Sequence, residues 1–287
     1  MITACILCDS LSPAGTRLTT MKVTMPRFLL AEFNTHRVFS RNTGSSRAIS
    51  VARRIAAVRS DPFMPSVWGQ EQRGMQAEAN ITNEDTIGDA QDSWRRAAYT
   101  ACEAAEQLSA IGVHKQIVNR LLEPFCWVDV IVSSTTWTNF FALRCSGGGA
   151  QPEMQVLADA MRDGLNSRVP DRLEWGAWHL PLVNREDLHH VGTYSNLLAL
   201  SAGRVAAVSY ERDGFAVPSV SLALAARLQR DGHWSPFEHI AQARAGKSDR
   251  CRNFIQDWDQ YRAVLETSQT PSREARIPPV VSPNSRP

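Results

Sequence analysis

The stretch from Phe33 to Arg47, FNTHRVFSRNTGSSR, most restricts how this chain can fold, because it crowds a histidine and several arginines among small polar residues. An arginine side chain offers a planar fork of donors that fits a phosphate or a carboxylate. Ser45 and Ser46 precede an apolar helical pattern that starts at Ala48, so they could cap a helix N-terminus, which favours anions. The residues alone leave two interpretations open. One is a pocket for a phosphorylated small molecule, and the other is a solvated, arginine-rich start of a helix.

The composition fits one large domain or two small ones. The chain has 287 residues, of which 43% are apolar, enough for a full core. No apolar run reaches the length of a membrane span, and the start MITACILCDS lacks the pattern of a signal peptide. We therefore expect a cytoplasmic protein with no membrane partner. The net charge of +2 is too small to argue for nucleic-acid binding.

The six cysteines are scattered and do not resemble a disulfide framework. Cys5 and Cys8 form one CxxC pair, but no second pair follows, so we expect no metal site. Cys126 and Cys145 are possible nucleophiles, although no residue near them in the sequence marks an activating base. Buried, reduced thiols are the prediction for all six.

Hydrophobic periodicity predicts a mixture of strands and helices without an internal repeat or a long linker. Strands are expected at residues 2–8, 17–25 and 125–133, and again after the segment HWSPFEH through residue 245. Helices are expected at residues 27–34, 46–58, 85–111, 114–122, 136–144, 152–166, 195–209, 218–231 and 252–265. Residues 69–83 and 170–193 are irregular. The Pro-, Ser- and Arg-rich residues 267–287 predict a disordered tail after a single catalytic domain of residues 1–266.

The stretch described first resembles the signature RHRxxSxNxxSxR of flavin-dependent thymidylate synthases. The matching positions are His36, Arg37, Ser40, Asn42, Ser45 and Arg47. Only the first position differs, because Thr35 replaces an arginine. So many fixed positions in one short stretch are far more specific than a glycine motif.

Three later segments extend the resemblance. Asn119–Pro124, NRLLEP, is similar to the family's ARxxLP and places Arg120 at a nucleotide-contacting arginine. Asn139–Arg144, NFFALR, is similar to Asn-x4-Arg, whose Asn touches the flavin and whose Arg binds the pyrimidine. His233–His239, HWSPFEH, is similar to HxSPFEH, whose serine contacts the flavin phosphate and whose first histidine lies beside the flavin.

The order of the segments differs from that of ordinary relatives. There, HxSPFEH and a RAARVSF segment precede the signature, whereas here HWSPFEH and Arg204–Tyr210, RVAAVSY, follow it. The chain therefore resembles a divergent, circularly permuted member, an arrangement that proteins tolerate when the old termini are close together. The resemblance then covers residues 17–245 except 170–193. It predicts that the strand after Ser235 shares a sheet with residues 19–25, and that Ser235 and Arg37 face one pocket.

The resemblance implies an α+β fold with an antiparallel sheet flanked by helices. It also implies a homo-oligomer, a tetramer whose subunits share active sites. The implied reaction is C5 methylation of a deoxypyrimidine monophosphate, dUMP to dTMP. FAD would be the cofactor, with NADPH and methylenetetrahydrofolate as co-substrates.

The resemblance assigns roles to the matching residues. The implied substrate-binding residues are Glu32, Thr43, Gly44, Ser45, Ser46, Arg47, Arg120 and Arg144. The implied flavin-binding residues are Thr35, His36, Arg37, Asn139, His233 and Ser235. Arg144 is also the implied catalytic residue, because a fixed positive charge beside N3–H of the base lowers its pKa and enriches the form whose C5 is nucleophilic.

Departures from the family pattern leave alternatives open. Thr35 replaces an arginine that touches flavin and nucleotide, and Ser133–Thr135 stand where relatives have a flavin-binding Asn-Ala-Arg. Glu32 replaces a nucleotide-binding Gln and could accept a hydrogen bond from a cytosine amino group. One alternative is hydroxymethylation of dUMP or dCMP at C5, if the methylene intermediate meets water instead of hydride. A non-catalytic nucleotide- or flavin-binding protein is the other.

Overall fold

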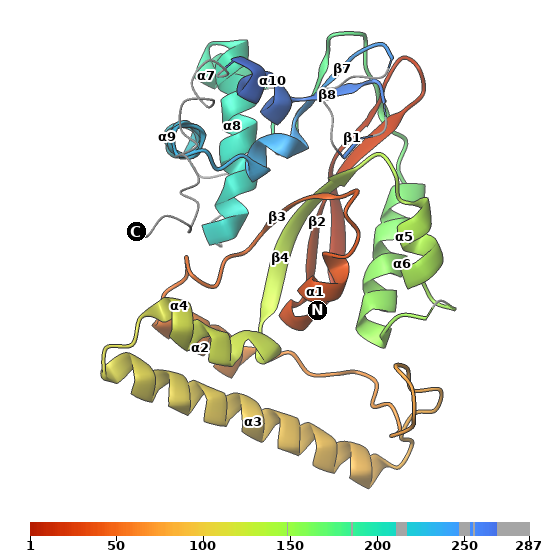
Figure 1. Cartoon of the computed structure of the whole chain (residues 1–287), viewed down its shortest axis with the longest axis vertical. Helices are drawn as coiled ribbons and strands as arrows, with labels where there is room; N and C mark the ends of the chain where they lie inside the picture. Colours follow the sequence, from red (N-terminus) through yellow and green to blue (C-terminus); the bar gives the residue numbers. More distant parts are fainter. Residues whose placement is uncertain (148, 185, 211–216, 247–252, 255, 269–287) are drawn as a thin grey trace, which may run out of the picture.

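The computed structural model describes residues 1–147, 149–184, 186–210, 217–246, 253–254 and 256–268. Its centre is a five-stranded sheet with the strand order β3-β4-β2-β1-β5 (Figure 1). The strands are β1 (Thr3–Leu11), β2 (Arg17–Pro26), β3 (Ser40–Thr43), β4 (Trp127–Ser134) and β5 (Asp171–Arg172). All neighbours pair antiparallel except β1 and β5. The predicted fold class, α+β with an antiparallel sheet flanked by helices, is confirmed.

One face of this sheet is apolar and covered by three helices, α1 (Leu30–Phe33), α5 (Thr138–Arg144) and α6 (Pro152–Asn166) (Figure 1). Successive strand residues point to opposite faces. In β4, Val128, Val130 and Val132 therefore join the core under these helices. Asp129 and Ser133 bond instead to groups on the other side. The alternation gives the sheet one dry face and one polar face.

The polar face meets a second layer. It contains α8 (Tyr194–Ala207), α9 (Pro218–Arg230) and a three-stranded sheet of β6 (Trp178–His179), β7 (Ala241–Ala243) and β8 (Trp258–Gln260). A buried chain of hydrogen bonds joins the two sheets. His179 Nε2 lies 2.8 Å from Thr20 Oγ1, which lies 2.5 Å from Ser133 Oγ, and Ser133 Oγ lies 2.8 Å from His239 Nδ1.

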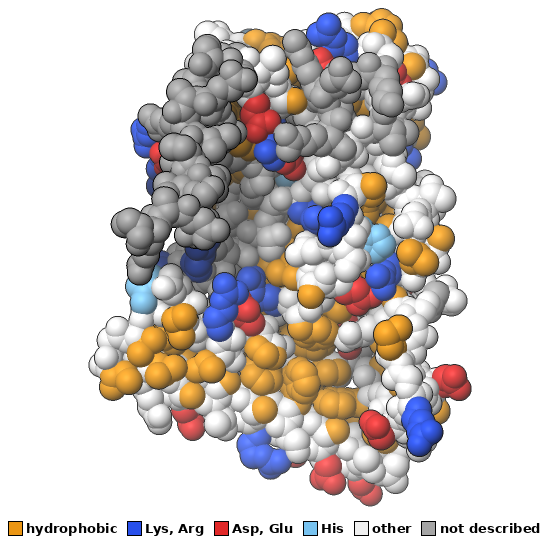
Figure 2. Space-filling view, viewed as in Figure 1, with side chains coloured by type: hydrophobic (Ala, Val, Ile, Leu, Met, Phe, Trp, Pro, Cys, Tyr) orange, Lys and Arg blue, Asp and Glu red, His pale blue; other side chains and the backbone are white. Residues whose placement is uncertain are grey.

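A third group of helices lies at one end of the sheet. It consists of α2 (Val51–Ser60), α3 (Glu84–Ala110), α4 (Lys115–Val118) and the 3₁₀ segment η2 (Asn119–Phe125), which share one apolar cluster. Figure 2 shows hydrophobic side chains gathered across this part of the surface, over α2 and α4. The remaining elements are η1 (Arg27–Leu29), α7 (Asp187–Val191), η3 (Val208–Tyr210), η4 (Ser235–His239) and α10 (Tyr261–Ser268). Among the described residues, no helix has the length and apolarity to cross a membrane.

Most predicted elements are present, but the start of one helix and the structure type of another segment were predicted wrongly. The helix expected from residue 46 begins at Val51, and the side chain that caps it is Ser50, which accepts a bond from the Arg53 N–H at 3.3 Å. Ser45 lies too far before Val51 to cap this helix, and its N–H donates to the Ser209 carbonyl at 3.1 Å, just after β3. The helix expected at residues 252–265 contains β8, because Trp258–Gln260 pair with β7. The predicted tail spans residues 267–287, of which 267 and 268 belong to α10 and the others lie outside the described residues.

The prediction for the strand after Ser235 was also wrong. This strand, β7, pairs with β6 and β8 and not with residues 19–25. The physical reason is that β2 lies between β4 and β1, so both of its edges already carry backbone hydrogen bonds. The segment before β7 instead packs against β3, at the edge of the main sheet.

Candidate functional site

Glu32, His36 and Arg144 form a cluster at the start of the signature segment. Arg144 is the last residue of α5, and Glu32 lies in α1. Arg144 Nη1 donates to Glu32 Oε1, and Arg144 Nε donates to His36 Nε2 at 3.1 Å. Arg144 Nη2 makes no hydrogen bond to any other described residue, and the side chain is 20% exposed. The cluster therefore fixes the guanidinium and leaves some of its donors facing outward.

The imidazole of His36 is held by aromatic packing. It stacks on Phe39 at 5.8 Å between ring centroids and meets the edge of Phe140 at 4.9 Å. Burial lowers the pKa of His36, and the neighbouring charges of Arg144 and Arg41 lower it further. A neutral ring can accept at Nε2, as the contact with Arg144 requires. His36 therefore acts as a neutral, rigid support for the arginine.

The segment HWSPFEH meets the middle of the signature. Ser235 Oγ donates to Asn42 Oδ1 at 3.3 Å, although 193 positions separate the two residues. Asn42 in turn donates through Nδ2 to the Val205 carbonyl at 2.8 Å and to Ser209 Oγ at 3.2 Å. Two segments that resemble the family, residues 204–210 and 233–239, thus converge on one signature asparagine.

The other end of the signature is tied to η2. Ser46 Oγ donates to Glu123 Oε1 at 2.5 Å, and Arg27 Nε and Arg120 Nη1 donate to the same oxygen at 2.9 and 2.8 Å. Asn119 Nδ2 also donates to the Ser46 carbonyl, at 2.7 Å. Burial raises the pKa of Glu123, but the Ser46 hydroxyl and the arginines outweigh this effect, so the pKa lies below its ordinary value. Three donors therefore converge on one oxygen of Glu123 at this end of the signature.

The other predicted site residues lie at the surface or along β3. Arg37, Arg47, Asn139 and His233 are exposed, and their side chains form no hydrogen bond with another described residue. Thr35 is exposed and its hydroxyl donates to the Glu32 carbonyl at 2.7 Å, so it closes the end of α1. Thr43 and Gly44 carry backbone contacts, with Thr43 O accepting from Ser209 Oγ and Gly44 O accepting from Arg27 Nη1.

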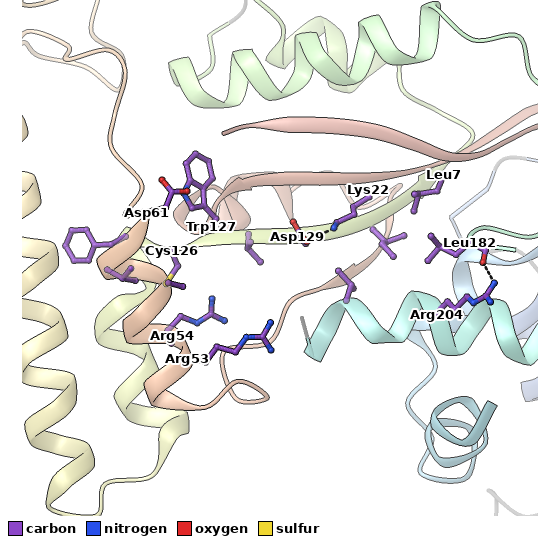
Figure 3. Close-up of a pocket in the computed structure, with 16 residues that line it drawn as sticks. Leu7, Lys22, Arg53, Arg54, Asp61, Cys126, Trp127, Asp129, Leu182 and Arg204 are labelled. Atoms are coloured by element: carbon purple, nitrogen blue, oxygen red, sulfur yellow. Dashed lines mark hydrogen bonds and ion pairs between the residues drawn. The ribbon is translucent and has the colours of Figure 1, made fainter. Parts of the chain in front are cut away.

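A cavity of about 560 Å³ lies on the polar face of the sheet, between α2 and α8 (Figure 3). We call it the α2–α8 cavity. Its lining consists of Leu7, Lys22, Arg53, Arg54, Ala57, Val58, Asp61, Phe125, Cys126, Trp127, Val128, Asp129, Ile131, Leu182, Arg204 and Val208. None of the substrate- or flavin-binding residues that the resemblance implies lines it, although Cys126, Arg204 and Val208 do. The signature strand still borders it, because Asn42 pairs with Ile131 and a Cβ on Gly44 would lie 3.3 Å from the Val128 side chain.

The family model described as "Thymidylate synthase complementing protein" matches residues 5–171. The chain belongs to this family. The matched range contains the signature and the segments Asn119–Pro124 and Asn139–Arg144, whereas HWSPFEH lies beyond it. A search of curated proteins found no match.

Two solved structures are similar to this chain. One is the UMP/dUMP methylase PolB from Streptomyces cacaoi bound with 5-Br UMP, with a TM-score of 0.50 and 17% identity. The match covers 58% of this chain and 89% of that chain. Another is thymidylate synthase X from Helicobacter pylori with FAD and dUMP, with a TM-score of 0.36, 18% identity, and coverage of 52% and 67%.

The cysteines of this family member are poor candidates for nucleophiles. All five described cysteines are free thiols, of which Cys102, Cys126 and Cys145 are buried and Cys5, contrary to prediction, is exposed. Burial raises the pKa of Cys145 to about 11, and it does the same for Cys8. A thiol with a raised pKa supplies little thiolate near neutral pH. Among the described residues, no group of three or more His, Cys, Asp or Glu side chains is placed to hold a metal ion.

Proposed function

We propose that this member of the thymidylate synthase complementing family methylates C5 of a deoxypyrimidine monophosphate, converting dUMP to dTMP. The observation that supports it most is the cluster of Glu32, His36 and Arg144, which joins the signature to the Asn139–Arg144 segment. Residues 1–266 would form one catalytic domain. The order of the segments keeps circular permutation as a prediction about how this domain arose.

Arg144 would activate the base. Its Nε and Nη1 are occupied by His36 and Glu32, so the group cannot rotate freely, while Nη2 remains available to a ligand. A guanidinium held in this way beside N3 of a pyrimidine stabilises negative charge on the ring. The charge raises the electron density at C5, which then attacks the one-carbon donor. No protein nucleophile is required.

The opposite end of the signature would hold the nucleotide. Arg47 is exposed and suits the 5′-phosphate, with Ser45, Ser46 and the backbone of Thr43 and Gly44 beside it. Arg120 is exposed next to this group and would orient the base. These residues and Arg144 do not line the α2–α8 cavity, which fits a site completed by another subunit.

Exposed apolar side chains at the helical end of the molecule support an interface between subunits, and the resemblance implies a homotetramer. Ile111, Ile117 and Leu121 are 76%, 56% and 40% exposed, and Ile117 belongs to α4, a helix over which Figure 2 shows hydrophobic side chains gathered. Apolar groups concentrated on one surface favour burial against a partner. We expect subunits of this chain to cover them.

The predicted flavin residues fit the chemistry of FAD. Arg37, Asn139, His233 and Ser235 are exposed donors, and a dinucleotide pyrophosphate needs such donors. Thr35 contributes no guanidinium, so the set has one charge fewer than the family signature. Bound FAD would supply the hydride, with NADPH as its reductant and methylenetetrahydrofolate as the carbon donor. His36 would hold Arg144 in place beside the bound FAD.

One observation favours a second candidate, C5 modification of dCMP. Glu32 lies beside Arg144, and a carboxylate can accept more than the one bond that Arg144 makes. A cytosine amino group could donate to it, whereas the uracil oxygen could not. Hydroxymethylation by the same residues, with water in place of hydride, is the corresponding product alternative.

Product analysis tests the proposal. The purified protein is incubated with FAD, NADPH and methylenetetrahydrofolate, and with either dUMP or dCMP, and the nucleotides are identified by mass spectrometry. Formation of dTMP from dUMP supports the proposal, and a hydroxymethyl product or turnover of dCMP selects the second candidate. Binding of nucleotide without any product would leave the non-catalytic alternative.

A further inference from the structure

The α2–α8 cavity is bounded by the main sheet, by α2, and by a third wall that contains Leu182 and Arg204. Its floor is the polar face of the main sheet, with Lys22, Asp129 and Ile131. Figure 3 shows Arg53 and Arg54 pointing from α2 into the space before α8. The volume of about 560 Å³ falls within the range of roughly 300–1,000 Å³ typical of small-molecule sites.

Basic side chains outnumber acidic ones in the lining. Lys22 Nζ pairs with Asp129 Oδ2 at 2.7 Å on the floor, so these two charges offset each other. Arg53 and Arg54 stand side by side on α2, and Asp61 is the acidic residue that lines the cavity from the end of this helix. Arg54 is only 4% exposed. Arginine side chains in a cavity lining can donate hydrogen bonds to the oxygens of a carboxylate or a phosphate.

The wall opposite α2 is held in a strained shape. Leu182 has φ 62°, a left-handed conformation that a branched side chain seldom adopts. Arg204 Nη1 donates to the Leu182 carbonyl and also to Asp187 Oδ2, each at 2.6 Å, and Nη2 donates to Asp187 Oδ1 at 2.8 Å. Arg204 and Asp187 are both buried. The segment 170–193, which resembles no family motif, is thus fixed as one wall of this cavity by the buried ion pair between its Asp187 and Arg204.

The rest of the lining is apolar. Leu7, Ile131, Leu182 and Val208 contribute side chains between the two helices. Such surfaces accept a flat organic ring, while the arginines on α2 accept an acidic group at one end of it. We propose that the α2–α8 cavity binds an aromatic organic anion, whose carboxylate or phosphate contacts Arg53 and Arg54.

This site is separate from the residues assigned to methylation, and the proposal does not require that the chain methylates. If it does, the aromatic anions at hand are a folate, with carboxylates, and the nucleotides, with phosphates. The cavity borders Asn42 and Gly44 of the signature, so a ligand here would lie next to the site proposed above.

The test is a fluorescence titration with anilinonaphthalene sulfonate, followed by competition with folic acid, dUMP and FAD. Two exposed alanines on α2 give a matched pair. Ala57 lines the cavity, whereas Ala56 lines the groove between α2 and α3. Ala57→Phe should fill the cavity and weaken binding by about tenfold or more, while Ala56→Phe should leave it within about twofold.

Substitutions of two arginines on α2 give a second test variant with its matched control. Arg53→Gln should weaken binding of the dye and its competitor by about tenfold. Arg59→Gln is the control, because Arg59 faces away from the cavity and pairs with Glu106. Circular dichroism checks that all four variants are folded.

Loss of binding in both cavity variants, with both controls intact, supports the proposal. Displacement by folic acid, by dUMP or by FAD then identifies a carboxylate or a phosphate ligand. The proposal is overturned if none of the four probes binds the wild type. It is also overturned if Ala57→Phe and Arg53→Gln bind as tightly as their controls.

Discussion

Both ends of the stretch from Phe33 to Arg47 hold arginine against glutamate, but they do so differently. At Glu123 a single carboxylate oxygen accepts from Ser46, Arg27 and Arg120. At Arg144 a single guanidinium donates to Glu32 and His36, and its Nη2 has no partner among the described residues. At the first end one carboxylate oxygen is fully engaged, whereas at the second end Arg144 Nη2 can still donate to a ligand.

Glu123 thus holds Ser46 and Arg120 in place at one end of the signature, whereas Arg144 at the other end can act on a bound base directly. Removing one member of a network of engaged charges lowers the free energy of unfolding, because the remaining charges stay partly buried without that partner. An arginine with outward donors can change without unfolding the chain, yet its loss removes charge stabilisation from a bound substrate. Substitutions at the two ends should therefore give opposite patterns of stability and activity.

The largest expected effect is on turnover by Arg144→Ala. Losing a transition-state electrostatic partner costs about 10²- to 10³-fold in kcat. The free energy of unfolding should change little, because the side chain is partly exposed and lies at the end of α5. Steady-state kinetics and thermal unfolding measure the two quantities. Arg162→Ala, at an exposed ion pair on α6, is the control. Near-wild-type activity in Arg144→Ala would mean that the Asn139–Arg144 assignment is wrong.

Glu123→Gln should show the opposite pattern, a loss of stability of about 1–3 kcal/mol with folded protein still able to turn over. Glu106→Gln is the matched control, since Glu106 pairs with Arg59 at the surface and should cost less than about 0.5 kcal/mol. Urea unfolding of both variants makes the comparison. Equal losses in the two variants would contradict a network of engaged charges at Glu123.

The same variant carries a pH test. The pKa of Glu123 in the folded chain lies below its ordinary value of 4.5. Its contribution to stability is therefore fully present above that value and is lost as the pH falls through the lower folded pKa. The difference in unfolding free energy between wild type and Glu123→Gln should shrink as the pH is lowered below 4.5. A constant difference would rule out the charged network.

His36 should contribute a smaller pH effect at the Arg144 end. Its pKa in the folded chain is lowered from the ordinary value of 6.5, so the unfolded chain takes up a proton first as the pH falls. The stability that neutral His36 contributes above pH 6.5 is therefore lost as the pH falls below 6.5. As the pH falls from about 7.5 to about 5.5, the wild type should lose more unfolding free energy than His36→Gln does. An identical pH profile for the two proteins would show that His36 is not held neutral.

The smallest effect is expected at the cysteines. Cys145 follows Arg144 directly, yet burial raises its pKa to about 11. Cys145→Ala should keep turnover within about twofold of wild type, and Cys126→Ser should do the same in any fraction that folds. A folded but inactive cysteine variant would indicate covalent catalysis and remove the need for Arg144 as the activating group.

Local periodicity predicted much of the fold. The alternation in residues 17–25 and the helical pattern in residues 152–166 correspond to β2 and α6 because each element buries one side of its own sequence. Trp258 was assigned to a helix because aromatic residues recur around it at helical spacing. Its pairing with Ala243 in β7 is a tertiary contact that no local pattern contains.

The candidate site was predictable only in part. The resemblance named Ser235 and Asn42, and the structure brings them into contact across 193 positions. It did not name Arg53 and Arg54, which look like solvated arginines on a surface helix until the fold turns them toward β4. Lys22, between Thr20 and Thr24 at alternate positions of one strand, was a local sign that the opposite face of the sheet is polar.

The central claim is that Arg144 activates the pyrimidine by favouring loss of the N3 proton. The direct measurement is the pKa of that proton in dUMP bound to the purified protein, followed by ultraviolet difference spectroscopy as the pH is raised. The account predicts a lower pKa for bound than for free nucleotide, and a return toward the free value in Arg144→Ala. Bound dUMP that titrates like free dUMP in the wild type, or identically in wild type and Arg144→Ala, would contradict it.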